Sequence, residues 1–269
     1  MQVWVNGEIT EDKNAISSAD RGFTLADGVF ETMYFDNSEV ELFQMHMIRL
    51  KSSLSALHIN MPYKDDEILN AIRELFDVNK MKSGAIRLTV TRGVGARGLS
   101  FADINSSTVV ISSASVERIQ TPVRICTTDY IRNEKSLLSS YKTLDYSESI
   151  MAFNSARIRG FGDAVMLNTV GNVACCTTSN IFLLRGNVLI TPPLKDGCLP
   201  GIMRSVIISI AKKMELKILE STVTKQHLDS ADAVFLSNSI VRLRKVSSFE
   251  NIHYDIENEI VNNIERNLR

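Results

Sequence analysis

Apolar residues recur with two different periods in the first 114 residues of the chain. Apolar side chains from Met47 to Leu57 recur at helical spacing, and residues 64–78 repeat the pattern, so two helices are predicted. Asn6-Gly7 separates two short apolar stretches, which is typical of a hairpin turn. The predicted strands cover residues 2–5, 8–9, 29–35, 40–43, 86–91 and 108–111.

Hydrophobicity drops over residues 115–121, which predicts a linker, and short strands dominate the chain after it. The predicted strands there cover residues 123–127, 164–167, 180–184, 188–191 and 234–237, and the predicted helices cover residues 145–159, 204–214 and 257–268. Strands mixed with helices in this order indicate an α+β fold rather than a doubly wound sheet. We therefore expect a smaller α+β domain over residues 1–114 and a larger, mainly β domain over residues 122–269.

Composition narrows the class of protein. The 269 residues are 44% hydrophobic and carry a net charge of −1, which excludes a disordered chain and argues against nucleic acid as the partner. No apolar run approaches the ~20 residues of a membrane helix, and the start of the chain lacks a signal-peptide pattern. The four cysteines show no metal-binding or disulfide spacing, so we expect free thiols, a cytoplasmic protein and a small-molecule substrate.

Residues 93–98 fit the pattern G-x-G-x-x-G after a predicted strand. A dinucleotide site also needs a helix directly afterwards, and the chain returns to a strand instead. We therefore predict a hairpin loop, in which Arg92 and Arg97 either face an anionic substrate or are simply solvated.

Three further positions could carry chemistry, and each also has an ordinary structural explanation. Residues 199–203 precede a predicted helix, whose N-terminus could bind a phosphate or could simply be capped. Lys142 lies between a polar loop and a helix, where a lysine can form a Schiff base if it is shielded from water. His46 and Arg49 share a helix face and could reach one anion. The histidines are dispersed, so no metal site is expected.

In chain order, these segments resemble the fold-type IV pyridoxal-phosphate enzymes, which include branched-chain and D-amino-acid aminotransferases and aminodeoxychorismate lyase. The matching segments are residues 5–7, 20–22, 27–31, 46–50, 142–144, 180–182 and 200–204. The resemblance implies a two-domain fold like that of D-amino-acid aminotransferase, with a β-barrel-like larger domain that carries the lysine. It also implies pyridoxal 5'-phosphate as the cofactor and a homodimer.

The resemblance also implies roles for individual residues. Lys142 would hold the cofactor and then act as the acid/base. The other cofactor-binding positions would be Arg49, Cys175, Gly201, Ile202, Met203, Asn238 and Ser239. Phe30, Arg92 and Arg97 would bind an anionic substrate that carries an amine.

Within the family, residues 92–100 and Asn238 look most like the lyase, which releases pyruvate and forms p-aminobenzoate, a folate precursor. One departure from the family matters for the chemistry, and Asp145, where many relatives carry asparagine, is a milder one. Cys175 stands where relatives carry a glutamate that pairs with the pyridine nitrogen. A thiol cannot pair with a pyridinium as a carboxylate does, so transamination should suffer more than an elimination driven by aromatisation.

Three functions therefore stay open. The lyase is first, and an aminotransferase for D- or branched-chain amino acids is second. The third is a non-catalytic relative that keeps the fold, because Cys175 could also mean a damaged site. The fold alone supports all three equally.

Overall fold

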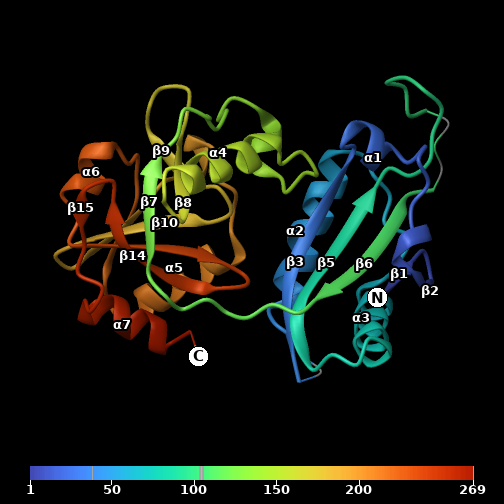
Figure 1. Ribbon diagram of the computed structural model, residues 1–269, viewed down its shortest axis with the longest axis horizontal. Helices are drawn as coiled ribbons and strands as arrows, with labels where there is room; N and C mark the ends of the chain where they lie inside the picture. Colours follow the sequence, from blue (N-terminus) through green and yellow to red (C-terminus); the bar gives the residue numbers. More distant parts are fainter. Residues whose placement is uncertain (38, 103, 105, 269) are drawn as a thin grey trace. The chain divides into compact units, whose positions relative to one another are not determined.

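A computed structural model describes residues 1–37, 39–102, 104 and 106–268 of the chain. It divides into two compact units, and Figure 1 labels the elements of both. Unit 1 is Met1–Glu117 with Lys142–Asp145, and unit 2 is Arg118–Tyr141 with Tyr146–Arg269. The sequence prediction assigned Lys142 to the larger C-terminal part. It belongs to unit 1 because its backbone pairs with a strand of that unit.

Unit 1 contains, within the described residues, a six-stranded antiparallel sheet in the order β2-β1-β6-β5-β3-β4. The strands are β1 (Gln2–Val5), β2 (Glu8–Glu11), β3 (Gly28–Asp36), β4 (Glu39–Val40), β5 (Ser83–Thr91) and β6 (Thr108–Ala114). Asn6 and Gly7 have φ of 49° and 104°, which confirms the predicted hairpin turn. β4 is shorter than the predicted strand over residues 40–43, because Phe43 already begins a helix.

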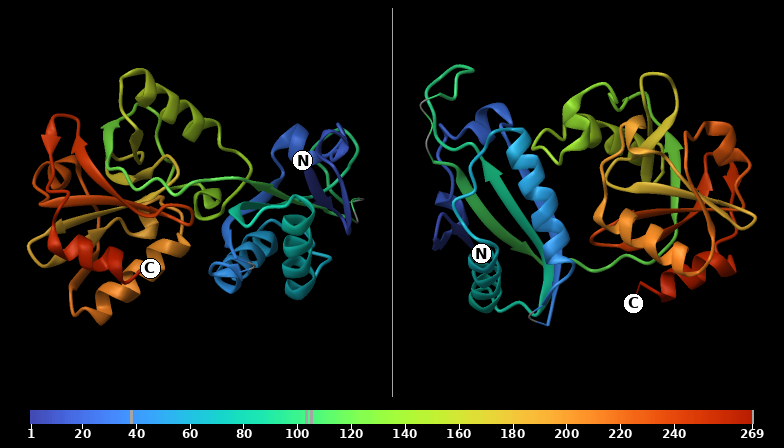
Figure 2. Two further views of the ribbon diagram at one scale, coloured as in Figure 1. Left: turned by 60° about the horizontal axis from the view of Figure 1, so that its bottom comes forward. Right: turned by 180° about the vertical axis from the view of Figure 1, so that it is seen from behind.

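Two helices, α2 (Phe43–Ala56) and α3 (Asp65–Val78), cover the same face of this sheet, as Figure 2 shows. Their apolar side chains have the predicted helical spacing and form one core with the strands. Met47 and Ile72 are fully buried in it beside Met33 of β3. A short helix, α1 (Arg21–Leu25), was not predicted; the carboxylate of Asp20 caps it by accepting a hydrogen bond from Gly22 N at 2.7 Å. A 3₁₀ turn, η1 (Asp12–Asn14), precedes it.

Unit 2 contains, within the described residues, a nine-stranded mixed sheet in the order β12-β11-β10-β13-β14-β7-β8-β9, with β15 paired to β14. The strands are β7 (Val123–Thr127), β8 (Asp163–Leu167), β9 (Val173–Cys176), β10 (Asn180–Arg185), β11 (Val188–Thr191), β12 (Lys217–Glu220), β13 (Ala233–Asn238), β14 (Arg242–Phe249) and β15 (Ile252–His253). The sheet curls until its two edges meet. Val173 of β9 donates from N to the carbonyl of Val223, just after β12, at 2.7 Å.

Helices surround the curled sheet of unit 2 (Figure 1). They are α4 (Ser147–Ile158), α5 (Ile202–Lys213), α6 (Lys225–Asp229) and α7 (Glu259–Arg266), with the 3₁₀ turns η2 (Leu137–Ser140) and η3 (Leu194–Asp196). β9, β12, β14, β15 and α6 were not predicted. β14 carries Arg244 and Lys245 between buried apolar residues, and β12 is short and mostly exposed, so neither shows a clear apolar period. No helix in the described part of the chain has the length and apolar character needed to cross a membrane.

Candidate active site

Lys142 is fixed in unit 1 by a short stretch of backbone pairing with β3. Phe30 N donates to the Lys142 carbonyl at 3.0 Å, and Leu144 N donates to the Gly28 carbonyl at 3.1 Å. Gly28 permits this close approach, because an added Cβ would lie 2.6 Å from the Val90 carbonyl and 2.8 Å from Leu144 Cδ1. The chain thus holds Lys142 against the N-terminal end of β3, whose other edge pairs with β5.

The Phe30 ring contacts two cations. Lys142 Nζ lies 4.3 Å from the ring centroid, and Arg87 Cζ lies 3.6 Å from it. Arg87 comes from β5, opposite Thr32 of β3. The structure therefore gathers an amine, an aromatic ring and a guanidinium in one place, which is a suitable setting for an anionic substrate near a reactive lysine.

Glu31, the next residue of β3, points to the opposite face of the sheet and binds two residues of α2. Arg49 donates to both of its carboxylate oxygens, at 2.8 Å and 2.6 Å. His46 Nδ1 lies 2.7 Å from Oε2. Burial would raise the pKa of Glu31, but the hydrogen bonds from Arg49 and His46 outweigh it and hold the pKa below its ordinary value. His46 and Arg49 do reach one anion, as predicted for their shared face, and within unit 1 that anion is Glu31.

Arg92 is buried and has hydrogen-bond partners within unit 1. Its guanidinium donates to both carboxylate oxygens of Asp27, at 2.8 Å and 3.0 Å, and to the carbonyls of Leu57 and His58. Asp27 also accepts from Arg21 Nε at 2.8 Å. Burial would raise the pKa of Asp27, but its bonds to the two arginines lower it.

Arg97, the second arginine of the predicted loop, is exposed. Its loop follows β5 without forming a helix, as the sequence predicted. Arg21 also binds this loop, because its Nη1 donates to the Gly98 carbonyl at 2.8 Å. The two arginines proposed for the substrate therefore differ in setting: Arg92 is tied into unit 1, and Arg97 is presented at its surface.

In unit 2, the N-terminus of α5 forms a backbone cradle suited to an anion. Gly201 is the N-cap, and it has no side chain that could accept from the first amides of the helix, those of Ile202 and Met203, so a ligand anion can take that role. An added Cβ on Gly201 would lie 1.9 Å from Asn180 Oδ1. Asn180 is itself anchored, because its Nδ2 donates to the Leu199 carbonyl at 2.9 Å. This close-fitting glycine turn at a helix N-terminus fits a phosphate group.

Asn238 organises the turn that follows β13. Its Oδ1 accepts from Ile240 N at 3.0 Å and from Val241 N at 2.9 Å, and its Nδ2 donates to Ser179 Oγ at 3.1 Å. Ser239 sits half-buried inside this turn. Asn238 therefore acts on the shape of the backbone, and Ser239 is the residue that the turn presents.

Cys175 lies on β9, half-buried, beside a small cluster that contains Ala152, Ala156 and Met166. Desolvation raises the pKa of its thiol to about 12, although the cation of Arg132 acts in the opposite direction. The thiol is thus neutral at physiological pH. The position at which the family resemblance implies a carboxylate is therefore uncharged in this chain.

The structure brings the predicted residues together in two groups, one in each unit. Unit 1 holds Lys142, Phe30, Arg49 and Arg92 along or beside β3, and unit 2 holds the α5 cradle, the Asn238 turn and Cys175. Sequence reasoning missed Arg87 and the role of Glu31. A charge inside the otherwise apolar stretch of β5 was the available signal for Arg87.

Comparisons with known proteins match nearly the whole chain. The model of the family Amino-transferase class IV matches residues 28–249. A putative branched-chain-amino-acid aminotransferase of Methanocaldococcus jannaschii is 30% identical over 98% of this chain and 90% of that protein. The crystal structure of a putative 4-amino-4-deoxychorismate lyase from Legionella pneumophila has 30% identity and a TM-score of 0.89, and 94% of each chain is covered.

A branched-chain aminotransferase from Thermoproteus uzoniensis, solved with norvaline, has 28% identity and a TM-score of 0.93, covering 100% of this chain and 94% of that one. The chain therefore belongs to the class IV aminotransferase family. Within it, the protein is a fold-type IV enzyme whose cofactor is pyridoxal 5'-phosphate. The predicted family, α+β fold class and cofactor are confirmed.

Proposed function

We propose that the protein is a 4-amino-4-deoxychorismate lyase, which releases pyruvate and forms p-aminobenzoate. The observation that carries the proposal is the neutral thiol of Cys175, at the position where the family resemblance implies a carboxylate. A reaction that returns electrons to the product by aromatisation needs a weaker electron sink than transamination does. The putative lyase from Legionella pneumophila, 30% identical, and a lyase from Pseudomonas aeruginosa, 25% identical, support the same choice.

When bound, the cofactor supplies the electron sink, and the residues of this chain supply binding and proton transfer. In unit 1, Lys142 would hold the cofactor, and its amine would then remove the ring proton of the substrate. Arg49, held by Glu31, would bind the phosphate, and Phe30, Arg92 and Arg97 would bind the substrate. In unit 2, the amides of Ile202 and Met203, which follow Gly201, and the side chain of Ser239 would bind the phosphate, while Asn238 would shape the turn that presents Ser239.

The experiment is a pyruvate-release assay with 4-amino-4-deoxychorismate and the cofactor-loaded enzyme. We expect pyruvate from the wild type, none from Lys142→Ala, and wild-type rates from Lys135→Ala, an exposed lysine in the preceding loop. The visible absorption band of bound cofactor should be present in the wild type and absent from Lys142→Ala. A cofactor band without pyruvate release would overturn the lyase.

The second candidate is an aminotransferase for D- or branched-chain amino acids. The similarity to the Methanocaldococcus jannaschii and Thermoproteus uzoniensis proteins favours it. Transfer of an amino group from D-alanine or L-leucine to a 2-oxo acid would establish it in place of the lyase. A protein that binds cofactor yet shows neither activity would be the non-catalytic relative.

A homodimer and a cytoplasmic location belong to the same proposal. Each unit exposes large apolar side chains, among them Leu99 at 83% in unit 1 and Ile158 at 88% in unit 2. Single exposed apolar side chains are also common on monomers, so the homodimer rests on the family resemblance. Light scattering coupled to size-exclusion chromatography should give twice the chain mass of 30.0 kDa. A measured mass equal to that of one chain would contradict the dimer.

A further inference from the structure

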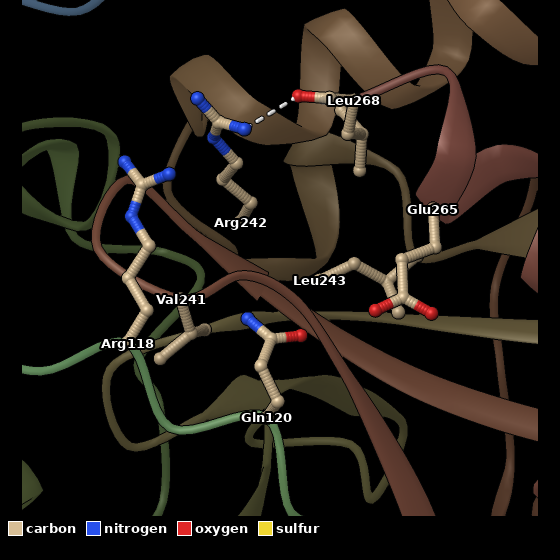
Figure 3. A pocket seen from close by; sticks show the side chains of 7 residues that line it. All are labelled: Arg118, Gln120, Val241, Arg242, Leu243, Glu265 and Leu268. Atoms are coloured by element: carbon tan, nitrogen blue, oxygen red, sulfur yellow. Dashed lines mark hydrogen bonds between the residues drawn. The ribbon is translucent and has the colours of Figure 1, made fainter.

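A pocket of about 260 Å³ lies in unit 2, and none of its lining residues is among those assigned above to the cofactor or the substrate. Figure 3 shows it between the start of unit 2, the beginning of β14 and the end of α7. Its lining residues are Arg118, Gln120, Val241, Arg242, Leu243, Glu265 and Leu268. A cavity of this size is at the lower limit of ligand sites, which span ~300–1,000 Å³, so it suits a molecule with about one ring.

Arg118 and Arg242 both line the pocket, and their guanidinium groups are drawn on the same side of it in Figure 3. The backbone of Arg242 has a φ of 60°, and its Nη1 donates to the Leu268 carbonyl at 2.8 Å, which fixes the direction of the side chain. Both arginines have partners within the chain, so a ligand would join existing contacts. Paired guanidinium groups at the edge of a cavity are well suited to a carboxylate.

The rest of the pocket has a different character. Val241, Leu243 and Leu268 line its middle with aliphatic side chains, and the Glu265 carboxylate lies at the end away from the two arginines (Figure 3). Glu265 is 3.7 Å from Lys245, whose ammonium also donates to Asn262 Oδ1 at 2.6 Å. The ammonium of Lys245 is thus shared between Glu265 and Asn262, and the Glu265 carboxylate can still accept a hydrogen bond from a ligand amine.

We propose that this pocket binds a small amino carboxylate. The ligand carboxylate lies against Arg118 and Arg242, its apolar body rests on Val241 and Leu243, and its amino group donates to Glu265. This proposal does not depend on the proposed reaction. The product of that reaction, an aminobenzoate, belongs to this ligand class. Binding of the product at the pocket could therefore regulate the enzyme.

The pocket is connected to the Asn238 turn through the backbone. Val241, which lines the pocket, donates from N to Asn238 Oδ1 at 2.9 Å. Arg244 Nε donates to the Thr121 carbonyl at 2.9 Å, which ties the segment of Arg118 to β14. A ligand that bridges Arg118 and Arg242 therefore joins this segment to the turn that presents Ser239.

Isothermal titration of the cofactor-loaded enzyme with 4-aminobenzoate tests the proposal. We expect one saturable site whose affinity falls about tenfold or more in Arg118→Gln and in Arg242→Asn, because each removes a charge-assisted hydrogen bond. Asparagine tolerates the left-handed backbone at position 242, and Arg118 lies outside helices and strands, so at least one variant should fold; thermal unfolding checks both. Arg124→Gln, an exposed arginine of β7, is the matched control and should bind normally.

Two further arms separate this pocket from the proposed active site. Lys142→Ala should retain the site, and the preference for 4-aminobenzoate over benzoate should disappear in Glu265→Gln. Absence of saturable binding, or affinity unchanged in both arginine variants, would overturn the proposal. Binding lost only in Lys142→Ala would overturn it too, since the ligand would then occupy the proposed active site. Failure of the lyase assay leaves all of these results unaffected.

Discussion

Glu31 binds Arg49 through both of its carboxylate oxygens, from a strand to the helix that covers it. The two bonds measure 2.8 Å and 2.6 Å, and Glu31 is 1% exposed. A bidentate pair fixes the plane of a guanidinium as well as its position. Glu31 is therefore a positioning residue for Arg49, and any ligand of Arg49 meets a guanidinium whose orientation is already set.

Replacing Glu31 by Gln should weaken the binding of pyridoxal 5'-phosphate about tenfold or more. An amide can accept only at one oxygen, so Arg49 would lose half of its orientation and its charge partner. A titration followed by the visible absorption of the bound cofactor measures the affinity. Glu39→Gln, an exposed carboxylate in the same unit, is the control. Equal affinities in the two variants would show that Arg49 does not hold the cofactor.

Gly201→Ala should destabilise unit 2 by about 1–3 kcal/mol, because the new Cβ would lie 1.9 Å from Asn180 Oδ1. Asn180 is buried and anchored to Leu199, so it can move little. Denaturant unfolding gives the free energy, and Asn180→Ala alone gives the cost of losing the anchor. The double variant should lose less than the sum of the two single losses. Additive losses would mean that the two residues do not collide.

Asp163→Asn should stabilise the protein at neutral pH. Asp163 Oδ1 accepts from Ala164 N at 2.7 Å and from the Thr177 hydroxyl at 2.6 Å, and an asparagine oxygen can accept the same bonds. Burial raises the pKa of Asp163 above its unfolded value of about 3.8, so the wild type loses stability as pH rises between the two values. The advantage of the variant should appear above about pH 4 and level off, whereas exposed Asp129→Asn should show none. A constant difference from pH 3 to 8 would contradict the shift.

The spacing of apolar residues predicted the main helices and strands of unit 1, because their apolar side chains pack into one core. It could not predict what charged residues do once they are inside. Glu31 and Asp163 lie within strands, and their partners on α2 and at Thr177 become neighbours only when the chain folds. Arg92 was correctly placed beside the loop, yet its guanidinium binds Asp27. The spacing of the two residues in the sequence gives no signal for that ion pair.

Arg92 and Arg97 should respond differently to charge reversal. Arg92→Glu removes the buried partner of Asp27 and places two carboxylates together, so we expect a loss of about 3–5 kcal/mol in the free energy of unfolding. Arg97→Glu lies on the surface and should change stability by less than about 0.5 kcal/mol. If Arg97 binds a substrate carboxylate, the KM of Arg97→Glu for the substrate should be at least about tenfold higher than that of the wild type, with little change in kcat. Arg73→Glu, exposed on α3, is the control, and an unchanged KM for Arg97→Glu removes that residue from the substrate site.

Cys175→Glu should place a negative charge at the position where the family resemblance implies a glutamate. The larger side chain packs beside Ala152 and Ala156, which costs about 1–3 kcal/mol of stability by overpacking, and Arg132 is the nearby cation. We expect the visible band of the bound cofactor to shift and amino transfer to a 2-oxo acid to rise relative to pyruvate release. Cys175→Gln has the same size without the charge, so it separates packing from electrostatics. Identical spectra and activity ratios in the two variants would show that charge at position 175 does not select the reaction.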